Sequence, residues 1–310
     1  MKMKKTLFVI ISLIAVILLG GFWLSSNLLK HSLKGTLYVS DGEGWHLYDW
    51  EKERLQEITW IGNANILKIC DARNGKIWVL SYVDDKYILQ LRTPEKVLYE
   101  TKVPFKPVDM CAYNGGVLLI RETNDFYQHM GGQKLTLRAR TGEIIYLTTD
   151  GSEPQTIAEC GFNTYPTETF LTSQENCFTF LPRAFKVIEN ERIVCETDTI
   201  LVYENGSIHK QNIPEDIWSL CAGGNTLVAV GTNRIFTLSS FSRTTKGIKC
   251  DGVSKGAISP DGKYYIFLRT HGFFGDAMDA YIMSISTGLL IRLKGMTGYE
   301  GAYFSFCWTD

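Results

Sequence analysis

The chain has 310 residues, a formal net charge of −1, and 45% hydrophobic and 21% charged residues, which is the composition of a globular protein. A net charge so close to zero, with no basic cluster beyond the first five residues, gives no electrostatic reason to expect binding of nucleic acid. The 28 glycines and the 12% aromatic content favour β structure that is rich in turns.

The N-terminus has the pattern of a membrane-targeting segment. Residues 1–5 form a basic tail, and residues 7–24 carry no charge. At about 1.5 Å per residue, an apolar helix over residues 6–29 is long enough to span the roughly 30 Å of a hydrocarbon core. Bulky Phe22, Trp23 and Leu24 stand where a cleavage site needs small residues. We therefore expect an uncleaved transmembrane signal anchor, and a cleaved signal peptide is the alternative.

The charges around this segment indicate its orientation. The lysines of the basic tail favour a cytoplasmic N-terminus, although Lys30 and Lys34 on the far side weaken the contrast. Residues 30–34 would then be a short linker, and residues 35–310 an extracytoplasmic domain. The expected protein is a single-pass protein of the cell membrane.

A faint repeat runs through residues 35–310, and each copy is a strand, a turn and a second strand. The aligned positions are Cys70, Cys111, Thr172, Cys221, Ile258 and Cys307. Spacings of roughly 40 to 60 residues leave room for four strands per copy, which is the unit of a β-propeller blade. The last copy, residues 302–308, is a single strand, whereas residues 35–60 supply three strands that lack a first one. Joining them covers both open sheet edges.

The sequence therefore predicts an all-β fold, a six-bladed β-propeller closed by pairing the C-terminal strand with the N-terminal blade and preceded by one transmembrane helix. Residues 302–308 are apolar or aromatic at nearly every position, as expected of an inner strand that is buried on both faces. We expect Phe304, Phe306 and Trp308 to be buried there.

The clearest copy lies at residues 257–293. Ser259-Pro-Asp-Gly262 is a turn, residues 264–268 and 281–286 alternate as strands do, and Thr287-Gly288 is a second turn. This unit resembles the repeat of TolB-type propellers, and residues 145–154 resemble the third strand and outer turn of the same repeat. The resemblance implies a propeller that binds proteins or peptides, or one that is ancillary to an enzyme. The chain departs from TolB because an anchor replaces the α/β domain.

The eight cysteines include no Cys-x-x-Cys pair, and no His-x-x-x-His accompanies them, so we expect no metal site. Four of them occupy the same place on the innermost strand of four blades, where a free cysteine packs as a small hydrophobe. A ring of thiols that holds a metal ion is the alternative, and disulfides among the four are not expected because radial strands diverge. The remaining cysteines, Cys160, Cys177, Cys195 and Cys250, are left undecided. The chain shows no P-loop and no complete dinucleotide fingerprint, so no cofactor is expected.

Three long connections join second and third strands and are expected on one face: residues 123–134, 182–198 and 270–279. Loops of this length usually need a function, and aromatic anchors carry much of the binding energy of recognition surfaces. The candidate binding residues are the aromatic, histidine and carboxylate side chains of the first and third loops: Asp125, Phe126, Tyr127, His129, His271, Phe273, Phe274, Asp276 and Asp279. The alternative is that these side chains pack on their own blades.

We therefore expect a binding module that presents one face to a protein, peptide or glycan at the membrane surface. One alternative is a carbohydrate-active or other hydrolytic or lyase enzyme, in which His271, Asp276 and Asp279 would act as acid and base if the carboxylates lay about 5 to 10 Å apart. Another is an accessory subunit of a membrane complex, held through its transmembrane segment. No complete set of catalytic residues is evident, so an enzyme is the less expected class, and the oligomeric state is not indicated.

Overall fold

The computed structural model describes residues 32–41, 44–61, 65–129, 136–162, 171–174, 177–180, 186–188, 192–194, 199–215, 217–231, 234–239, 243–249, 253–271, 277–299 and 304–310. The chain divides into two units, Met1–Lys34 and Gly35–Asp310. The basic tail and the anchor expected over residues 6–29 lie outside the described residues. Among the residues that are described, no helix is both long and apolar enough to cross a membrane.

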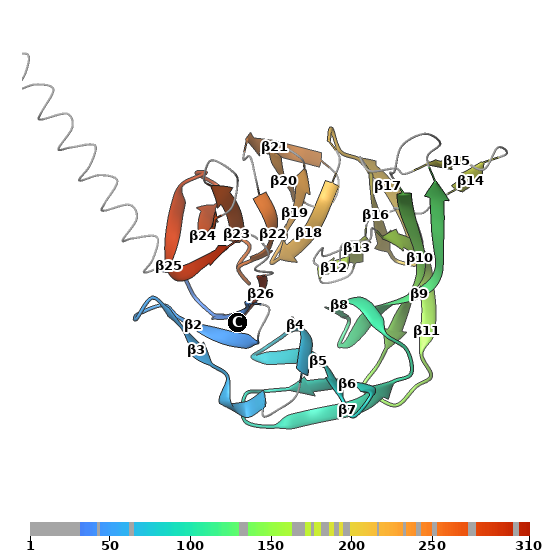
Figure 1. Ribbon diagram of the computed structural model, residues 1–310, viewed down its shortest axis with the longest axis horizontal. Coiled ribbons are helices and arrows are strands. Elements are labelled where there is room, and N and C mark those ends of the chain that lie inside the picture. Colours follow the sequence, from blue (N-terminus) through green and yellow to red (C-terminus); the bar gives the residue numbers. More distant parts are fainter. Residues whose placement is uncertain are drawn as a thin grey trace, which may run out of the picture. The chain divides into compact units, whose positions relative to one another are not determined.

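The unit Gly35–Asp310 is a six-bladed β-propeller, as the repeat predicts (Figure 1). Each blade is a four-stranded antiparallel sheet, with its innermost strand nearest the ring axis. From the innermost strand outwards, the blades are β26 (Ser305–Thr309), β1 (Thr36–Ser40), β2 (Trp45–Asp49) and β3 (Arg54–Glu57); β4 (Asn65–Arg73), β5 (Lys76–Val83), β6 (Lys86–Arg92) and β7 (Val97–Val103); β8 (Pro107–Tyr113), β9 (Gly116–His129), β10 (Thr136–Leu147) and β11 (Gln155–Phe162); β12 (Leu171–Gln174), β13 (Cys177–Phe180), β16 (Thr199–Glu204) and β17 (Ser207–Asn212); β18 (Ile217–Gly223), β19 (Thr226–Gly231), β20 (Arg234–Ser239) and β21 (Arg243–Lys249); β22 (Val253–Ile258), β23 (Tyr264–His271), β24 (Ala277–Ser284) and β25 (Leu290–Tyr299). A 3-10 turn, η1 (Thr59–Ile61), and a small hairpin, β14 (Lys186–Ile188) with β15 (Arg192–Val194), complete the described elements.

The innermost strands contact one another in sequence around the ring. β4 contacts β8, β8 contacts β12, and β12 contacts β18, which contacts β22. β22 then contacts β26, and β26 contacts β4, so the circle of contacts is complete. Residues far apart in the sequence therefore meet along the ring axis.

The first blade combines the two ends of the domain. β26 pairs antiparallel with β1, from Thr36 opposite Thr309 to Ser40 opposite Ser305. Among the described residues the strand occupies Ser305–Thr309, one residue beyond the expected end at 308, and residues 302 and 303 of the expected range lie outside the described residues. Phe304 and Trp308 are buried as expected, whereas Phe306 is only half-buried.

Two tight contacts lie where β1 begins. The Trp50 indole donates a hydrogen bond to the Gly35 carbonyl over 3.2 Å, and its ring lies 5.4 Å from that of Trp308. Gly35 has a φ of +90°, and a Cβ there would lie 2.1 Å from the Thr309 carbonyl oxygen. Only glycine meets both conditions, because other residues avoid this conformation and would clash.

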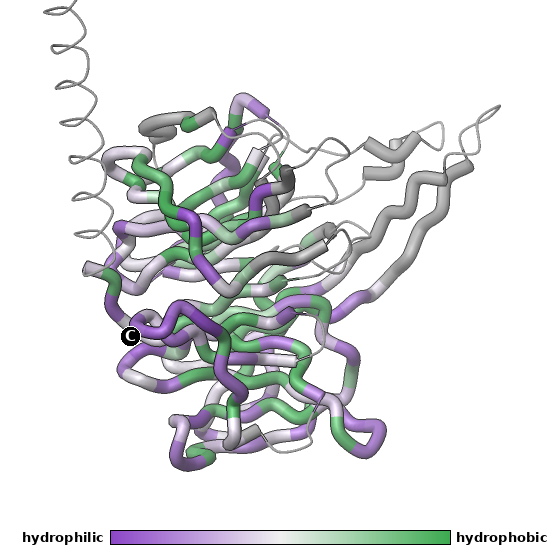
Figure 2. The backbone as a smooth tube through the Cα atoms, turned by 60° about the vertical axis from the view of Figure 1, so that its left-hand side comes forward, coloured by the Kyte–Doolittle hydropathy of each residue, from purple (hydrophilic) through white to green (hydrophobic). Residues whose placement is uncertain are grey.

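The core lies between neighbouring blades. Val117, Leu118, Leu119 and Ile120 follow one another on β9 and are all 0% exposed, because a second strand is covered on both faces by adjacent blades. This continuous apolar run differs from the alternation of half-solvated strands. Ile208 on the outer strand β17, by contrast, is 49% exposed. In Figure 2, hydrophobic colour follows the strands and hydrophilic colour gathers at many turns.

The Ser259-Pro-Asp-Gly262 turn is stabilised by its own side chains. The Ser259 hydroxyl donates to the Asp261 carboxylate over 2.6 Å and accepts the Tyr264 N–H over 3.0 Å. The same carboxylate accepts the Lys263 N–H over 3.1 Å, and Gly262 takes a φ of +72°. The motif therefore satisfies its own polar groups where β22 turns into β23.

Candidate ligand-binding site

A cavity of about 500 Å³ lies at one end of the channel that the innermost strands surround. Its walls come from all six of these strands and from the hairpins that lead into the second strands. Asn114 and Asn225 belong to two such hairpins, and Asp310 follows β26. The cavity therefore exists only when all six blades are in place.

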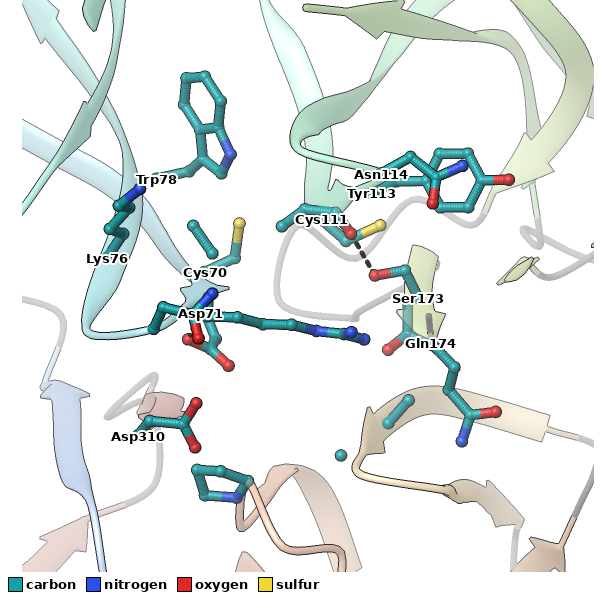
Figure 3. A pocket seen from close by; sticks show the side chains of 18 of the residues that line it. Cys70, Asp71, Lys76, Trp78, Cys111, Tyr113, Asn114, Ser173, Gln174 and Asp310 are labelled. Carbon is teal, nitrogen blue, oxygen red and sulfur yellow. Dashed lines mark hydrogen bonds between the residues drawn. The ribbon is translucent and has the colours of Figure 1, made fainter. Parts of the chain in front are cut away.

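Two carboxylates from neighbouring blades lie on one side of this cavity, Asp71 on β4 and Asp310 after β26 (Figure 3). Asp71 Oδ1 accepts the Arg73 N–H over 2.9 Å. The pKa of Asp71 is raised to about 6, mainly by burial and also by the Asp310 charge, while the Arg73 N–H and guanidinium act in the opposite direction. At neutral pH the ionised form of Asp71 is therefore poorly stabilised.

Strand β12 supplies polar groups to another part of the wall (Figure 3). The Ser173 hydroxyl donates a hydrogen bond to the Ala112 carbonyl. Gln174 is only 8% exposed, and its Nε2 has no hydrogen-bond partner among the described residues. A buried amide donor without an acceptor is unfavourable, so a ligand that brings an acceptor would stabilise it.

Aromatic rings supply the apolar part of the wall. Trp78 and Trp308 are 1% and 3% exposed, and Tyr113 packs edge-on against Phe178 with ring centroids 5.2 Å apart. Packing of this kind fixes the wall before a ligand arrives. The exposed side chains of Arg73 and Lys76 lie on the β4–β5 hairpin at the rim.

The cysteine positions predicted from the repeat are confirmed. Cys70, Cys111, Cys221 and Cys307 lie on β4, β8, β18 and β26, with Thr172 on β12 and Ile258 on β22. The four thiols are free, and burial raises the pKa of each, that of Cys70 to about 12. They are therefore neutral packing groups, two of which, Cys70 and Cys111, line the cavity.

Of the four cysteines left undecided by the sequence, the structure describes two. Cys160 and Cys177 are buried, and Cys195 and Cys250 lie outside the described residues. In the described part of the chain, no three histidine, cysteine, aspartate or glutamate side chains are grouped so as to hold a metal ion.

The described strand ends that flank the expected recognition loops lie at the opposite end of the blades from the cavity. Each innermost strand ends at the cavity, and the second strand runs away from it, so the connections between second and third strands are on the other face. Asp125, Phe126, Tyr127 and His129 lie in β9, where it pairs with β10 beyond its last pair with β8 at Arg121. They therefore belong to a hairpin that extends past the inner strand of its blade.

The candidate binding residues of the third loop are only partly described by the structure. The backbone of His271 ends β23, whereas Phe273, Phe274 and Asp276 lie outside the described residues. Asp279 on β24 is 3% exposed and forms an ion pair of 2.7 Å with Arg292, so its carboxylate is already engaged within the blade. The second long loop contains the hairpin β14–β15.

Sequence reasoning missed the cavity residues, although one signal was present. Asp71 directly follows Cys70, a position that the repeat alignment places on an innermost strand. A carboxylate next to a channel-lining position could have been singled out on that ground. Gln174 and Asp310 carry no comparable signal, because nothing local in the sequence brings them to the same cavity.

No family model and no curated protein matches this chain. Among solved structures, it is similar to a TolB candidate from Agrobacterium tumefaciens, with a TM-score of 0.52 and 10% identity over 90% of this chain and 99% of that one. It is also similar to a protein of unknown function from Bacteroides caccae, with a TM-score of 0.50 and 10% identity over 89% of this chain and 100% of that one.

A third similar structure is the acylaminoacyl peptidase of Pyrococcus horikoshii, with a TM-score of 0.51 and 11% identity. The match covers 84% of this chain and 44% of the peptidase. At such low identity these likenesses show the propeller fold and nothing finer. Because TolB-like and peptidase proteins both contain this fold, function must be argued from the site.

Proposed function

We propose that the propeller is a binding module that receives its ligand at the mouth of the central channel. The observation that carries this proposal is the cavity of about 500 Å³, to which every innermost strand contributes. Its volume is within the range of small-ligand pockets, roughly 300 to 1,000 Å³, and it combines aromatic walls with a few converging polar groups. A cavity of this size accepts one or two side chains or sugar rings of a larger partner.

We propose in addition that the module works at the outer surface of the cell membrane. The uncharged residues 7–24 behind a basic tail support an anchor over residues 6–29, with residues 35–310 on the extracytoplasmic side. The partner would then be a protein, peptide or glycan at that surface. Pairing of β26 with β1 would hold the ring, and with it the cavity, in its closed form.

Partner capture from membranes with the full-length protein tests the site. Asn225 is exposed on the β18–β19 hairpin and lines the cavity, so Asn225→Trp places a bulky group at its mouth. Ile208→Trp, on the exposed outer strand β17, is the matched control. We expect Asn225→Trp to lower recovery of the partner at least about tenfold and Ile208→Trp to leave it unchanged, with both variants melting like the wild type.

A second set of substitutions tests whether binding occurs in the cavity or at the opposite end of the blades. If Phe273→Ala with Phe274→Ala removes capture while Asn225→Trp has no effect, binding occurs on the face of the long loops and not in the cavity. That result would overturn the proposal for this site.

A second function is favoured by one observation, the pKa of about 6 of Asp71 in a cavity that it shares with Asp310. A carboxyl group that titrates near neutral pH can exchange protons with a substrate, and glycoside hydrolysis uses two carboxyl groups in this way. A panel of chromogenic glycosides tests this alternative. Turnover with a pH limb near 6 that disappears in Asp71→Asn would support an enzyme. Turnover that persists in this variant would exclude Asp71 as the acid or base.

A further inference from the structure

The carboxylate oxygens that line the cavity accept fewer hydrogen bonds than they could. Asp71 Oδ1 accepts the Arg73 N–H, but no donor among the described residues bonds to Oδ2. The ion pairs of the described part of the chain include neither Asp71 nor Asp310. A carboxylate offers about four acceptor sites, and a buried one is normally paired with a positive charge. A ligand that supplies N–H donors and a positive charge would therefore complete the site.

The groups that face Asp71 do not neutralise it. Tyr38 on β1 has its pKa raised to about 12 by burial, and burial also raises that of Cys307 on β26, so both are neutral. Asp310 adds negative charge. Arg73 lies on the same strand as Asp71, but its side chain is exposed at the rim, where solvent and salt screen its charge. The Asp310 charge acts on Asp71 more strongly than the Arg73 charge does, and the Lys68 ammonium near Cys70 and Cys307 is paired with Asp109. The inner part of the cavity is therefore negative when both carboxyl groups are ionised.

The rest of the wall fits a basic side chain on a peptide. Trp78 and Trp308 back the wall of the cavity, but at 1% and 3% exposed they present little ring surface, so the polar groups must hold the basic side chain. Gln174 lines the same cavity, is nine-tenths buried, and has an Nε2 that lacks an acceptor among the described residues. A peptide carbonyl next to the basic side chain is an acceptor of the kind that this amide needs.

We propose that the channel mouth binds the ammonium or guanidinium group of a basic side chain on a partner peptide, held between the carboxylates of Asp71 and Asp310. This inference rests on the binding function proposed above and names its ligand class. It assigns Asp71 and Asp310 as the charge-recognition residues and Gln174 as a donor to the peptide backbone.

Short blocked peptides test this assignment on the full-length protein. The probes are acetyl-Gly-Arg-Gly-amide and acetyl-Gly-Lys-Gly-amide, and the neutral comparisons carry citrulline or norleucine at the centre. Binding is followed by tryptophan fluorescence, because Trp78 and Trp308 line the cavity, and by calorimetry. We expect saturable binding of a basic peptide at pH 7.5 and at least tenfold weaker binding of its neutral counterpart. Affinity should fall below about pH 6, where Asp71 takes up a proton.

Variants identify the carboxylate that is responsible. Asp71→Asn should weaken binding of the basic peptide at least tenfold, and Asp310→Asn should weaken it less, because Asp310 is the more exposed of the two. Asp84→Asn is the matched control. Asp84 is exposed in the β5–β6 turn at a φ of +47°, which asparagine also adopts readily, and this turn is at the far end of the blade.

Each contrary result has a distinct meaning. If Asp84→Asn weakens binding as much as Asp71→Asn, the attraction is general to the surface and the inference fails. If neutral peptides or maltotriose bind as well as the basic peptide, the cavity binds ligands but does not select charge. If no probe binds although Asn225→Trp still abolishes partner capture, the channel mouth remains the binding site and the basic-peptide assignment is wrong. If calcium chloride alone changes the fluorescence and Asp71→Asn prevents it, the carboxylates hold a metal ion instead.

Discussion

Deleting residues 302–310 should unfold or aggregate the domain, although nine residues are few in a chain of 310. The deletion removes β26 and exposes the edge of β1 over its whole length. Phe304 and Trp308 are 4% and 3% exposed. Their burial contributes about 3 to 6 kcal/mol in total on transfer scales, and each lost strand hydrogen bond adds about 0.5 to 1.5 kcal/mol. The sum is comparable to the whole net stability of a domain, about 5 to 15 kcal/mol.

Circular dichroism melting and light scattering after size exclusion measure the effect. Trp308→Ala alone should destabilise by about 3 to 5 kcal/mol, as large-to-small changes at buried aromatic residues do. Leu98→Ala, on the outer strand β7 where the side chain is 40% exposed, should cost much less. A truncated protein that stays monomeric and melts within a few degrees of the full chain would falsify the proposal that β26 holds the ring closed.

Asp71→Asn should stabilise the protein at pH 8 and flatten its pH dependence between about 4 and 6, measured by denaturant unfolding. The pKa of Asp71 is about 6 in the native state and 3.8 for an ordinary aspartate, so the native state binds this proton more tightly than the unfolded state does. The free energy of unfolding of the wild type therefore falls as pH rises from about 4 to 6, by at most about 3 kcal/mol. Asp109→Ala should destabilise by about 3 to 5 kcal/mol, because the buried Asp109 is ion-paired with Lys68. The Asp109 carboxylate also accepts the N–H groups of Met110 and Leu171 over 2.8 and 3.0 Å. If Lys68→Met costs as much as Asp109→Ala, the ion pair and not these backbone contacts dominates. Phe273→Ala with Phe274→Ala should leave the melting temperature nearly unchanged and weaken partner capture if these rings face a partner, whereas a collapse of melting would make them core residues.

The number of blades and the equivalent positions on the innermost strands could be predicted because both follow from local chemistry. Asn-Gly and Pro-Asp-Gly turns need positive φ, and the structure has it at Asn114, Asn205 and Gly262. The strands that follow the turns at Asn114 and Gly262, β9 and β23, are apolar at successive positions because neighbouring blades cover them on both faces, whereas β17 after Asn205 is an exposed outer strand. The repeat therefore places Cys111 and Cys221 at equivalent positions from the sequence alone.

The cavity could not be predicted in the same way. Its polar residues come from hairpins far apart in the chain, and which of them converge depends on how the blades stack around the axis. Asp71 in isolation looks like an ordinary polar residue near a hairpin. The long loops with aromatic residues gave a stronger local signal, and they drew the prediction to the opposite end of the blades. The half-buried Phe306 shows the same limit, since its neighbours in sequence do not reveal how well the next blade covers it.

The pairing of Thr36 with Thr309 also has a consequence for the order of folding. These residues are among the first and the last of the domain to be synthesised. The first blade therefore has only three strands, β1 to β3, until synthesis of the other five blades is complete. During this interval β1 presents an unpaired edge of the kind to which other strands add. Contacts between such distant residues form slowly, and partly folded chains with open edges aggregate. The closing step should therefore limit the folding rate, and slow production of the C-terminal residues should favour aggregation over the native ring.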